Sequence, residues 1–600
     1  MASTTSPTRQ AEPLMHRRRY SLWRLLRANL HDLALLVRDS SLALIGFAVV
    51  MVLGSLYFHY VSPAHLALHV AFYQSIKLVL FISDQPFPAD PLGDALFFIV
   101  PLLGLALIVQ GVLNFGRLVL DKSSRREAWQ VSLASTYRGH VIVCGLGHVG
   151  LRVVTQLREA GYDAVIVERN WSSDYVSRAL NLSVPVVAGD AREHMVLHQA
   201  GLKGARAVVA CVNDDLINIE IALAARAGHA DIATVLRVFS DELDRNLERS
   251  FGPNTAFSTS AVAAPTLAAA AVSHQIDYVL TLENSDDLLA VTRLTAQPEN
   301  QWPATLGELE RNAGLRVLAH QRSNGQLARP LPTNQLALGD QLTVLASLPA
   351  LELLRLARVD NAVTTQLGAR RSRQSMELLD RVIICGLGKV GYRVVSRLAR
   401  LTPRPQIVVI HLDDELSFAK QISQLEGVTT IIGDARDPAI LQRAGIQQAT
   451  TVAAVTSQDL TNLQIGLAAQ RMFPQVHLVL RVFSDALAGQ LIDLVGISTT
   501  YSTSELAGPT LAAAAILPGI GQAFFAGDEL YATDQVLAHA GDALSGQSIE
   551  AVRAAQQALV IGIRRKGVSL LLPPPNTILA PGDELTMLAC LDDLAKLRGR

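Results

Sequence analysis

A glycine-rich turn of the kind that binds phosphate groups occurs twice in the chain, once in each half. The first copy reads G-L-G-H-V-G over residues 145–150, and the second reads G-L-G-K-V-G over residues 386–391. In each copy an apolar strand runs directly into the turn, and a helical pattern follows it. The first glycine makes the tight turn, the second lets backbone approach a pyrophosphate, and the third allows close helix–strand packing. The pattern predicts two nucleotide-binding turns.

Charged residues at the ends of later strands are candidates for further contacts with a nucleotide. Glu168 ends the strand that follows the first turn, where a carboxylate would accept hydrogen bonds from ribose hydroxyls. That favours NAD(H), ATP or ADP over a 2′-phosphorylated cofactor. Arg237 follows another apolar strand and is a candidate for a phosphate contact, with a structural salt bridge as the alternative. In the second copy His411 takes the acidic position, so we expect that site to be weak, altered or empty unless Asp413 substitutes.

The two copies belong to a long internal repeat. Residues 189–192, G-D-A-R, return as residues 433–436, and L-R-V-F-S-D at 236–241 recurs letter for letter at 480–485. Each repeat is predicted to contain an alternating strand–helix lobe and a smaller lobe that closes on a Gly-Asp turn. Each repeat is long enough for us to expect that it buries its own core.

Composition narrows the class of protein. The 600 residues carry a formal net charge of −1, which gives no support to a nucleic-acid partner. The four cysteines do not indicate a disulfide framework. Cys144 and Cys385 hold equivalent positions at the end of a strand, and we expect buried thiols in a reducing compartment.

The N-terminal part is predicted to be a membrane segment. Residues 42–58 and 95–116 carry no charge, and the second stretch is long enough as a helix to cross a ~30 Å hydrocarbon core. Basic residues flank both stretches, so the positive-inside rule places both termini in the cytoplasm. Residues 22–38 indicate a helix on the membrane surface, or alternatively a solvated basic helix. The apolar residues 66–82 are interrupted by Lys77, which favours a re-entrant helix over a third span.

This layout resembles the potassium channels gated by RCK (regulator of potassium conductance) domains, and two such units resemble the tandem subgroup. The resemblance rests on the two-span layout, the G-L-G-x-V-G turns, the Gly-Asp-Ala turns, and Asp215 with Asn218, which Asp459 and Asn462 parallel. It implies a two-span α-helical membrane domain plus two tandem α/β Rossmann-like RCK units, each with a small α+β C-lobe. It also implies that Asp190 lies beside the adenosine. The candidate cofactor-binding residues are Gly145, Leu146, Gly147, His148, Val149, Gly150, Glu168, Asp190, Ala191, Arg237, Gly386, Gly388, Gly391 and Asp434.

The corresponding domain boundaries follow from the repeat and the apolar stretches. We expect a basic N-terminal segment at 1–40 and a membrane domain at 41–120, with its re-entrant segment at 64–83. The first N-lobe is expected at 138–255 and the first C-lobe at 256–356. A linker at 357–379 leads to the second N-lobe at 380–499 and the second C-lobe at 500–600.

The segment in the place of the family's selectivity filter departs from the pattern. Residues 82–91 contain no glycine but include Pro86, Pro88 and Pro91, whose fixed φ cannot build a glycine-type carbonyl cage. Asp84 and Asp90 are candidates for acidic rings that attract cations, or alternatively for solvated loop carboxylates. Pro101, Gly104 and Gly111 give the second span places to bend, although such residues are common in membrane helices.

The resemblance implies a nucleotide-regulated membrane cation channel or channel-like protein of the potassium type in the plasma membrane, with two spans and a homotetrameric assembly. The alternative is a non-conducting, membrane-tethered nucleotide sensor that regulates a transport partner. The sequence contains no Ser/His/Asp arrangement, zinc spacing or Walker lysine, so we expect neither an enzyme nor a metal site. A membrane-tethered oxidoreductase is the competing class, and turnover of NADH with a hydrophobic acceptor would support it.

Overall fold

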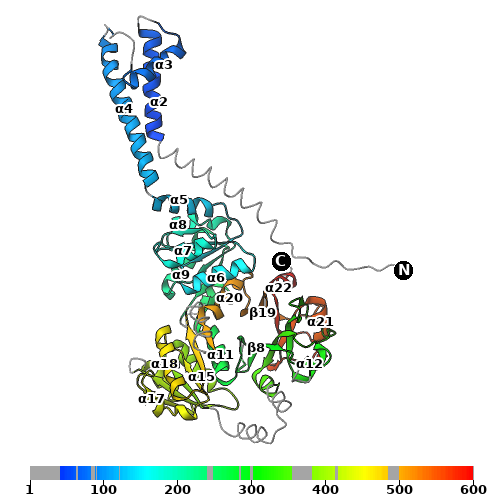
Figure 1. Ribbon diagram of the computed structural model, residues 1–600. Coiled ribbons are helices and arrows are strands. Elements are labelled where there is room, and N and C mark those ends of the chain that lie inside the picture. Colours follow the sequence, from blue (N-terminus) through cyan, green and yellow to red (C-terminus); the bar gives the residue numbers. More distant parts are fainter. Residues whose placement is uncertain are drawn as a thin grey trace. The chain divides into compact units, whose positions relative to one another are not determined.

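The computed structural model describes residues 41–62, 65–82, 88, 91–120, 122–239, 247–282, 285–297, 302–354, 381–412, 416–483 and 499–598. The chain forms two compact units (Figure 1). The first is built on the residues up to Arg138 together with 185–188 and 198–201, and the second contains the remainder. The predicted surface helix at 22–38, Asp84, Asp90, the linker 357–379 and Asp413 lie outside the described residues.

The described residues from Ser41 to Ala134 form helices. One segment, Gly93–Gln110, is long and apolar enough to cross a membrane by its length and composition, and Ile45–Val61 is a shorter apolar helix, among the residues described. The 12-residue helix between them would extend only ~18 Å, less than a bilayer core. The helices are α2 (Ser41–Leu56), the π-helical turn η1 (Tyr57–Val61), α3 (Leu68–Val79), α4 (Pro91–Leu120) and α5 (Lys122–Ala134).

Small residues let these helices approach one another closely. A Cβ at Gly104 of α4 would lie 2.6 Å from a methyl carbon of Val79, and one at Gly54 of α2 would lie 2.9 Å from Ser75 Oγ. Gly104, which the sequence suggested as a place to bend, therefore serves as a packing surface for α3.

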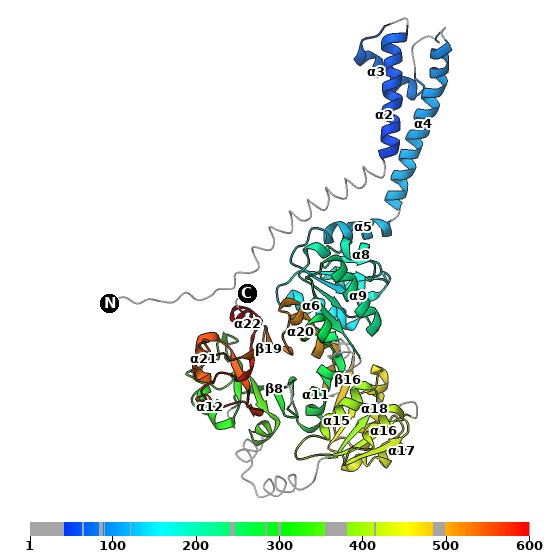
Figure 2. The same ribbon diagram turned by 180° about the vertical axis from the view of Figure 1, so that it is seen from behind.

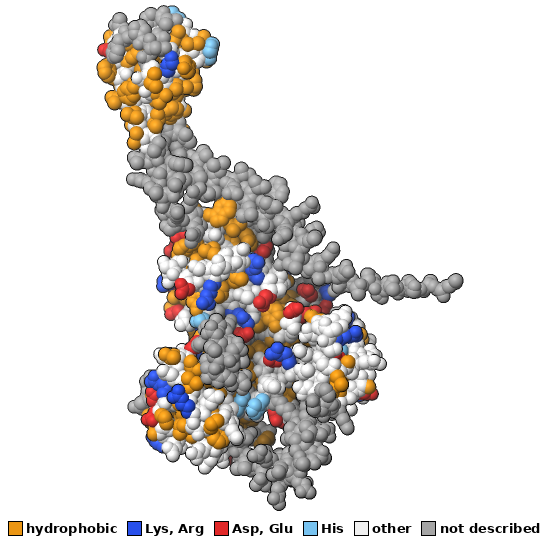
Figure 3. Space-filling view, in the orientation of Figure 1, with side chains coloured by type: hydrophobic (Ala, Val, Ile, Leu, Met, Phe, Trp, Pro, Cys, Tyr) orange, Lys and Arg blue, Asp and Glu red, His pale blue; other side chains and the backbone are white. Residues whose placement is uncertain are grey.

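The outer surface of α2, α3 and α4 is apolar. Hydrophobic side chains gather over this part of the molecule in Figure 3. Contiguous apolar surfaces on proteins commonly mark contacts with a membrane or another protein. Its exposed members include Ile45, Val49, Val52, Leu53, Leu68, Phe72, Leu80, Phe98, Ile99, Leu102 and Leu105.

The N-terminal helices are followed by a doubly wound parallel sheet, in which β1 lies between β2 and β4 with both neighbours parallel. The strand order β3-β2-β1-β4-β5-β6 is that of a Rossmann-like lobe, as the sequence predicted. Its elements are β1 (Val141–Cys144), α6 (His148–Glu159), β2 (Ala164–Glu168), α7 (Asp174–Asn181), β3 (Val186–Ala188), α8 (His194–Gln199), η2 (Leu202–Gly204), β4 (Ala207–Ala210), α9 (Asp215–Gly228), β5 (Ala233–Arg237) and β6 (Ala256–Phe257).

The second repeat folds in the same way, with the strand order β14-β13-β12-β15-β16-β17. Its elements are β12 (Arg381–Cys385), α15 (Lys389–Leu398), β13 (Gln406–His411), α16 (Leu416–Ile422), β14 (Val428–Ile432), α17 (Pro438–Arg443), η4 (Ile446–Gln448), β15 (Thr451–Ala454), α18 (Asp459–Met472), β16 (His477–Val482) and β17 (Thr500–Ser502).

Each N-lobe is followed by a small lobe with a five-stranded antiparallel sheet, and the two sheets have equivalent strand orders. The Gly-Asp turns are structural here: Asp340 accepts hydrogen bonds from the backbone N–H groups of Ala337 and Ser323, and pairs with buried His320 at 2.8 Å. The elements are β7 (Tyr278–Thr281), β8 (Leu288–Thr295), α12 (Leu306–Ala313), β9 (Arg316–Gln321), β10 (Leu327–Ala328) and β11 (Gln341–Ser347), then β18 (Ala523–Ala526), β19 (Glu529–Leu537), α21 (Ile549–Gln556), β20 (Leu559–Arg565), β21 (Val568–Leu571), β22 (Glu584–Cys590) and α22 (Leu591–Leu597).

The two repeats exchange one helix each. Helix α11 (Thr259–Val272) of the first repeat packs on α15 of the second, and α20 (Thr503–Ile516) of the second packs on α6 of the first (Figure 2). One hydrophobic core therefore contains residues of both repeats, such as Leu267 and Val394.

This exchange differs from the expectation that each repeat buries its own core. Both helices are alanine-rich and buried on nearly every side, so a single lobe cannot cover them. An ion pair between Arg152 of α6 and Glu505 of α20, at 2.7 Å, reinforces one of the two contacts.

Candidate functional site

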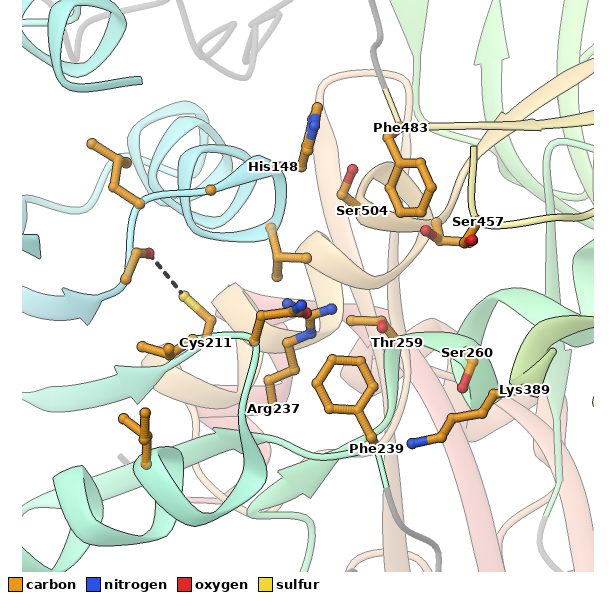
Figure 4. A pocket seen from close by; sticks show the side chains of 18 of the residues that line it. His148, Cys211, Arg237, Phe239, Thr259, Ser260, Lys389, Ser457, Phe483 and Ser504 are labelled. Atoms are coloured by element: carbon orange, nitrogen blue, oxygen red, sulfur yellow. Dashed lines mark hydrogen bonds between the residues drawn. The ribbon is translucent and has the colours of Figure 1, made fainter. Parts of the chain in front are cut away.

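A cavity of about 630 Å³ lies where the carboxyl ends of β1, β2, β4 and β5 meet the second repeat. Ligands of α/β sheets bind at such strand ends, beside the point where the strand order reverses. The first repeat contributes Gly145, Leu146, Gly147, His148, Val149, Val167, Glu168, Arg169, Gly189, Asp190, Ala191, Cys211, Val212, Asn213, Ile217, Ile221, Arg237, Phe239, Thr259 and Ser260. The second contributes Gly388, Lys389, Val390, Val455, Thr456, Ser457, Arg481, Phe483, Thr503 and Ser504 (Figure 4).

The glycine turn has the geometry that its sequence predicts. Gly145 has a φ of +94°, which favours glycine. A Cβ at Gly150 would lie 2.0 Å from the carbonyl oxygen of Gly145, so only glycine permits that helix–strand contact. At Gly147 a Cβ would meet nothing within 4 Å, so the space over the second glycine is open. The backbone here is accessible to a bound group at the N-terminus of α6.

Glu168 lies against this turn. The Leu146 N–H donates to Glu168 Oε2 at 2.6 Å, and the Asn170 N–H donates to Oε1 at 2.7 Å. The carboxylate is therefore fixed beside the phosphate-type turn, where a ribose of a bound dinucleotide lies in this class of fold.

The equivalent position in the second repeat is different. His411 is only 3% exposed, and its Nδ1 lies 2.8 Å from the backbone oxygen of Leu412. An imidazole that is buried in this way presents no acceptor at the second turn, although Gly386, Gly388 and Gly391 reproduce the first turn closely.

Asp190 lines the cavity but already has a partner. Its carboxylate accepts hydrogen bonds from Nε and Nη2 of Arg192 and from the Arg192 backbone N–H, and these bonds lower the pKa of Asp190 to about 2. Asp434 is held by Arg436 in the same way, which also lowers its pKa. Both carboxylates are therefore ionised at neutral pH.

Asp215 and Asn218 connect the strand ends rather than line the cavity. Asn218 is fully buried, and its amide donates to the carbonyl oxygens of Val212 and Arg237, each at 2.8 Å. Asp215 Oδ1 accepts a hydrogen bond from the Phe239 N–H at 2.8 Å. These residues position Arg237 and Phe239 at the edge of the cavity.

Two contacts across the repeats mirror each other. His148 of the first turn lies with its ring centroid 5.8 Å from that of Phe483, and Lys389 Nζ lies 4.9 Å from the Phe239 ring centroid. The residue that follows G-L-G in each repeat, His148 or Lys389, therefore lies near the phenylalanine of the opposite repeat. Figure 4 shows Lys389 extending toward Phe239 and His148 beside Phe483.

The sequence-predicted residues divide by repeat. Those of the first repeat line the cavity, with the exception of the packing residue Gly150, and of the second repeat only Gly388 does so. Gly386, Gly391 and Asp434 lie outside this cavity. Sequence reasoning missed Arg481, Lys389 and the two phenylalanines. Arg481 and Phe483 lie in the L-R-V-F-S-D motif that recurs letter for letter. Their equivalence to Arg237 and Phe239 is the sequence feature from which they could have been predicted.

The cysteines beside the first glycine turn and at the equivalent place in the second repeat are buried. Cys144 and Cys385 are buried free thiols, as predicted, and burial raises the pKa of both. Cys211 donates from Sγ to the carbonyl oxygen of Gly145 at 3.3 Å. Over the described part of the chain, His, Cys, Asp and Glu form no group of three that could hold a metal ion.

The TrkA-N domain model matches residues 141–259 and 382–503, and the TrkA-C domain model matches residues 535–599. The fold and these matches define a protein with tandem RCK units. The chain belongs to the TrkA-N/TrkA-C (RCK) family, as its motifs predicted. The first small lobe has the strand order of the second, which carries the TrkA-C match.

Related proteins act in potassium transport. A "Trk system potassium uptake protein TrkA homolog" of Archaeoglobus fulgidus is 27% identical over 232 residues, 36% of this chain and 49% of the relative. "Potassium channel protein 1" of Methanocaldococcus jannaschii is 23% identical over 239 residues, 38% of this chain and 70% of the relative. "Trk system potassium uptake protein TrkA" of Vibrio alginolyticus is 25% identical over 375 residues, which are 60% of this chain and 77% of the relative. The chain thus spans about half the length of the Archaeoglobus relative.

Two solved structures share the fold over nearly the whole chain. The "GsuK Channel" has a TM-score of 0.56 at 18% identity, and "GsuK channel bound to NAD" has a TM-score of 0.51 at 19% identity. Each alignment covers 95% of this chain and 99% of the other.

Proposed function

We propose that this chain is a membrane protein of potassium transport whose tandem RCK units bind an adenine nucleotide at the first glycine turn. The observation that carries the proposal is the cavity over Gly147, which is open, lies at the N-terminus of α6 and is flanked by Glu168. Its volume falls within the range of ligand pockets, roughly 300–1,000 Å³. One structural neighbour is described as bound to NAD, which supports the same class of ligand.

The ligand is NAD(H), ATP or ADP. The backbone of the turn and the positive end of α6 would hold the phosphates, and Glu168 would accept hydrogen bonds from ribose hydroxyls. A 2′-phosphate would place negative charge beside this carboxylate, so NADP is disfavoured. Asp190 and Ala191 line the cavity and are proposed to lie beside the adenosine.

The two turns are expected to differ in affinity. Calorimetric titration of the full-length protein with ADP should show one tight site per chain and a second that is at least about tenfold weaker, because His411 is buried and accepts nothing from ribose. The whole chain is required, because separated repeats would expose the core that they share. Two sites of equal affinity, or a tighter second site, would contradict the assignment.

The membrane arrangement is part of the proposal. Residues 41–61 and 91–120 would form two spans in the plasma membrane, with α3 between them and both termini in the cytoplasm. The apolar outer surface of these helices supports burial in lipid. Two spans cannot enclose a pore, so the conducting form would be a homotetramer around one axis.

Nucleotide binding would regulate the membrane segment through residues 121–138, which join the two parts of the chain. Moving a closed–open equilibrium from 1:99 to 99:1 takes ~5.5 kcal/mol, or ~1.4 kcal/mol for each of four equivalent sites. One charge-assisted hydrogen bond that forms only in one state supplies about this much. The contacts within the first site are therefore sufficient.

The second candidate function is a non-conducting nucleotide sensor that acts on a transport partner. The proline-rich, glycine-free sequence at residues 82–91 favours it. Single-channel recording in reconstituted bilayers, with K⁺ and Na⁺ gradients and with and without ADP or NAD, separates the two. Nucleotide-dependent current supports the channel, whereas silence together with calorimetric binding of nucleotide supports the sensor.

Any current is expected to discriminate K⁺ from Na⁺ poorly. Pro86, Pro88 and Pro91 stand where a selective filter needs glycine-type dihedrals, so a carbonyl cage cannot form there. Under a K⁺/Na⁺ gradient the reversal potential should lie near zero. A value close to the potassium equilibrium potential would show that another segment forms the filter.

A further inference from the structure

Two arginines, one from each repeat, line the cavity at equivalent positions. Arg237 ends β5 and Arg481 lies in β16. Each guanidinium stacks on the phenylalanine two residues further on, 4.5 Å from the Phe239 ring centroid and 4.4 Å from that of Phe483. In Figure 4, Arg237 and Phe239 point into the cavity. The pseudo-symmetry of the chain thus brings a cation from each half to the same place.

Neither arginine forms an ion pair with a residue that the structure describes. Arg481 Nη1 donates to the carbonyl oxygen of Thr456 at 3.2 Å, whereas the Arg237 side chain makes no hydrogen bond or ion pair with any residue that the structure describes. The Nε atoms of both arginines are buried and lack partners within the same described part. The nearest carboxylates, Asp215 and Asp459, accept hydrogen bonds from the backbone N–H groups of the two phenylalanines.

The remaining charges of the cavity leave it positive. Arg169 and Lys389 also line it, and its two carboxylates, Glu168 and Asp190, are held by backbone N–H groups and by Arg192. Burial lowers the pKa of Arg237, although the Asp215 carboxylate acts in the opposite direction. Burial is also the largest cause that lowers the pKa of Arg481 to about 10; the Asp459 carboxylate opposes this shift and the neighbouring Arg237 charge adds to it. Both arginines remain cations at neutral pH. Asp215 and Asp459 offset part of the cost of burying these charges near each other, and an anion between the two guanidinium groups would offset more of it.

Polar groups surround the same space. Thr259 and Ser260 begin α11, and Thr503 and Ser504 begin α20, so two helix N-termini with hydroxyl groups line the cavity together with the arginines. A phosphate oxygen is the group best suited to guanidinium forks and helix N-termini at once.

We propose that a phosphate group binds between Arg237 and Arg481, so that one nucleotide is held by both repeats. The proposal rests on the proposed function, because the nucleotide seated on the first glycine turn carries such a group; free inorganic phosphate has the same chemistry. Binding would remove the repulsion between the arginines and tie the two N-lobes together. The second repeat then contributes to the first site, in addition to the weaker site at its own glycine turn.

Titration calorimetry on the full-length protein in detergent tests this with ADP, adenosine and inorganic phosphate. Arg481→Gln should weaken ADP binding roughly ten- to a hundredfold, although this residue belongs to the other repeat, and Arg237→Gln should do the same. Adenosine affinity should change less than about twofold. Arg404→Gln is the matched control, because Arg404 pairs with Glu426 outside the cavity and its loss should leave ADP affinity unchanged.

The phosphate arm identifies the source of the group. If inorganic phosphate binds the wild type but not Arg481→Gln, free phosphate occupies the site. If the arginine substitutions weaken the binding of ADP only, the phosphate group belongs to the nucleotide. Either result supports the proposal.

The proposal is overturned if Arg237→Gln weakens ADP binding and Arg481→Gln does not. It is also overturned if both variants bind ADP with wild-type affinity. If Gly147→Val still loses ADP in those cases, the proposed function stands; if Gly147→Val also binds normally, the proposed function fails. Should Arg481→Gln melt abnormally, Arg481→Lys, which keeps the charge, must bind ADP more tightly than Arg237→Gln.

Discussion

Replacing Gly147 with valine is expected to abolish the thermal stabilisation that adenine nucleotide gives the full-length protein. The space over this residue is open, so the side chain fits the folded protein but occupies the place of the pyrophosphate. The backbone dihedrals at Gly147, φ −109° and ψ −158°, suit any residue, so the melting temperature without ligand should stay within a few degrees of wild type. At a ligand concentration of 100 times Kd the lost stabilisation is about 2.7 kcal/mol.

Gly388→Val is the equivalent substitution in the second repeat, at a residue that lines the same cavity. Gly388 holds the same N-cap position in the second repeat and also faces open space, so the two substitutions place the same side chain in the same local geometry. Differential scanning fluorimetry with ADP should show a shift that Gly388→Val retains in greater part and Gly147→Val loses. A full shift in Gly147→Val would mean that the first turn is structural and that the nucleotide binds elsewhere.

Replacing Gly150 with alanine is expected to destabilise the folded lobe itself, whereas the Gly147 substitution blocks only the ligand. Its Cβ would lie 2.0 Å from the carbonyl oxygen of Gly145, which is backbone and cannot move without opening the contact between α6 and β1. We expect a loss of about 3 kcal/mol or more in unfolding free energy. Chemical denaturation followed by circular dichroism measures it.

Gly391→Ala in the second repeat should behave in the same way, since its Cβ would lie 2.1 Å from the Gly386 oxygen. Gly147→Ala, three residues from Gly150 in the same turn, should be nearly neutral. If Gly150→Ala were as stable as Gly147→Ala, the close helix–strand contact would not be what selects glycine at the third position.

The local architecture was predictable from the sequence because each part of it has a short-range cause. The strand–turn–helix pattern around Gly145 specified the Rossmann-like strand order, and the repeated turn at Gly386 specified its second copy. The same applies to Glu168, whose distance from the turn follows from one strand–helix unit.

The contacts between the repeats were not predictable in this way. Nothing in the spacing of Arg481 says that it faces the first glycine turn, because this depends on α11 and α20 crossing to the opposite lobe. The alanine-rich sequences of those helices show that they are buried but not against which partner. The burial of His411 was also missed, because a histidine that ends a strand can turn toward the core or toward the turn.

The exchanged helices have a consequence for how such a chain can arise. A single repeat leaves its crossover helix without a lobe to cover it, so an unfused ancestor would have to be a dimer of two identical chains. Fusion replaces that concentration-dependent association by a tethered one, with an effective concentration in the millimolar range. Two identical chains must share every substitution, whereas fused copies are free to differ. The pairs Glu168 and His411, and His148 and Lys389, are such differences, and they turn a symmetric dimer into a receptor with two distinct halves.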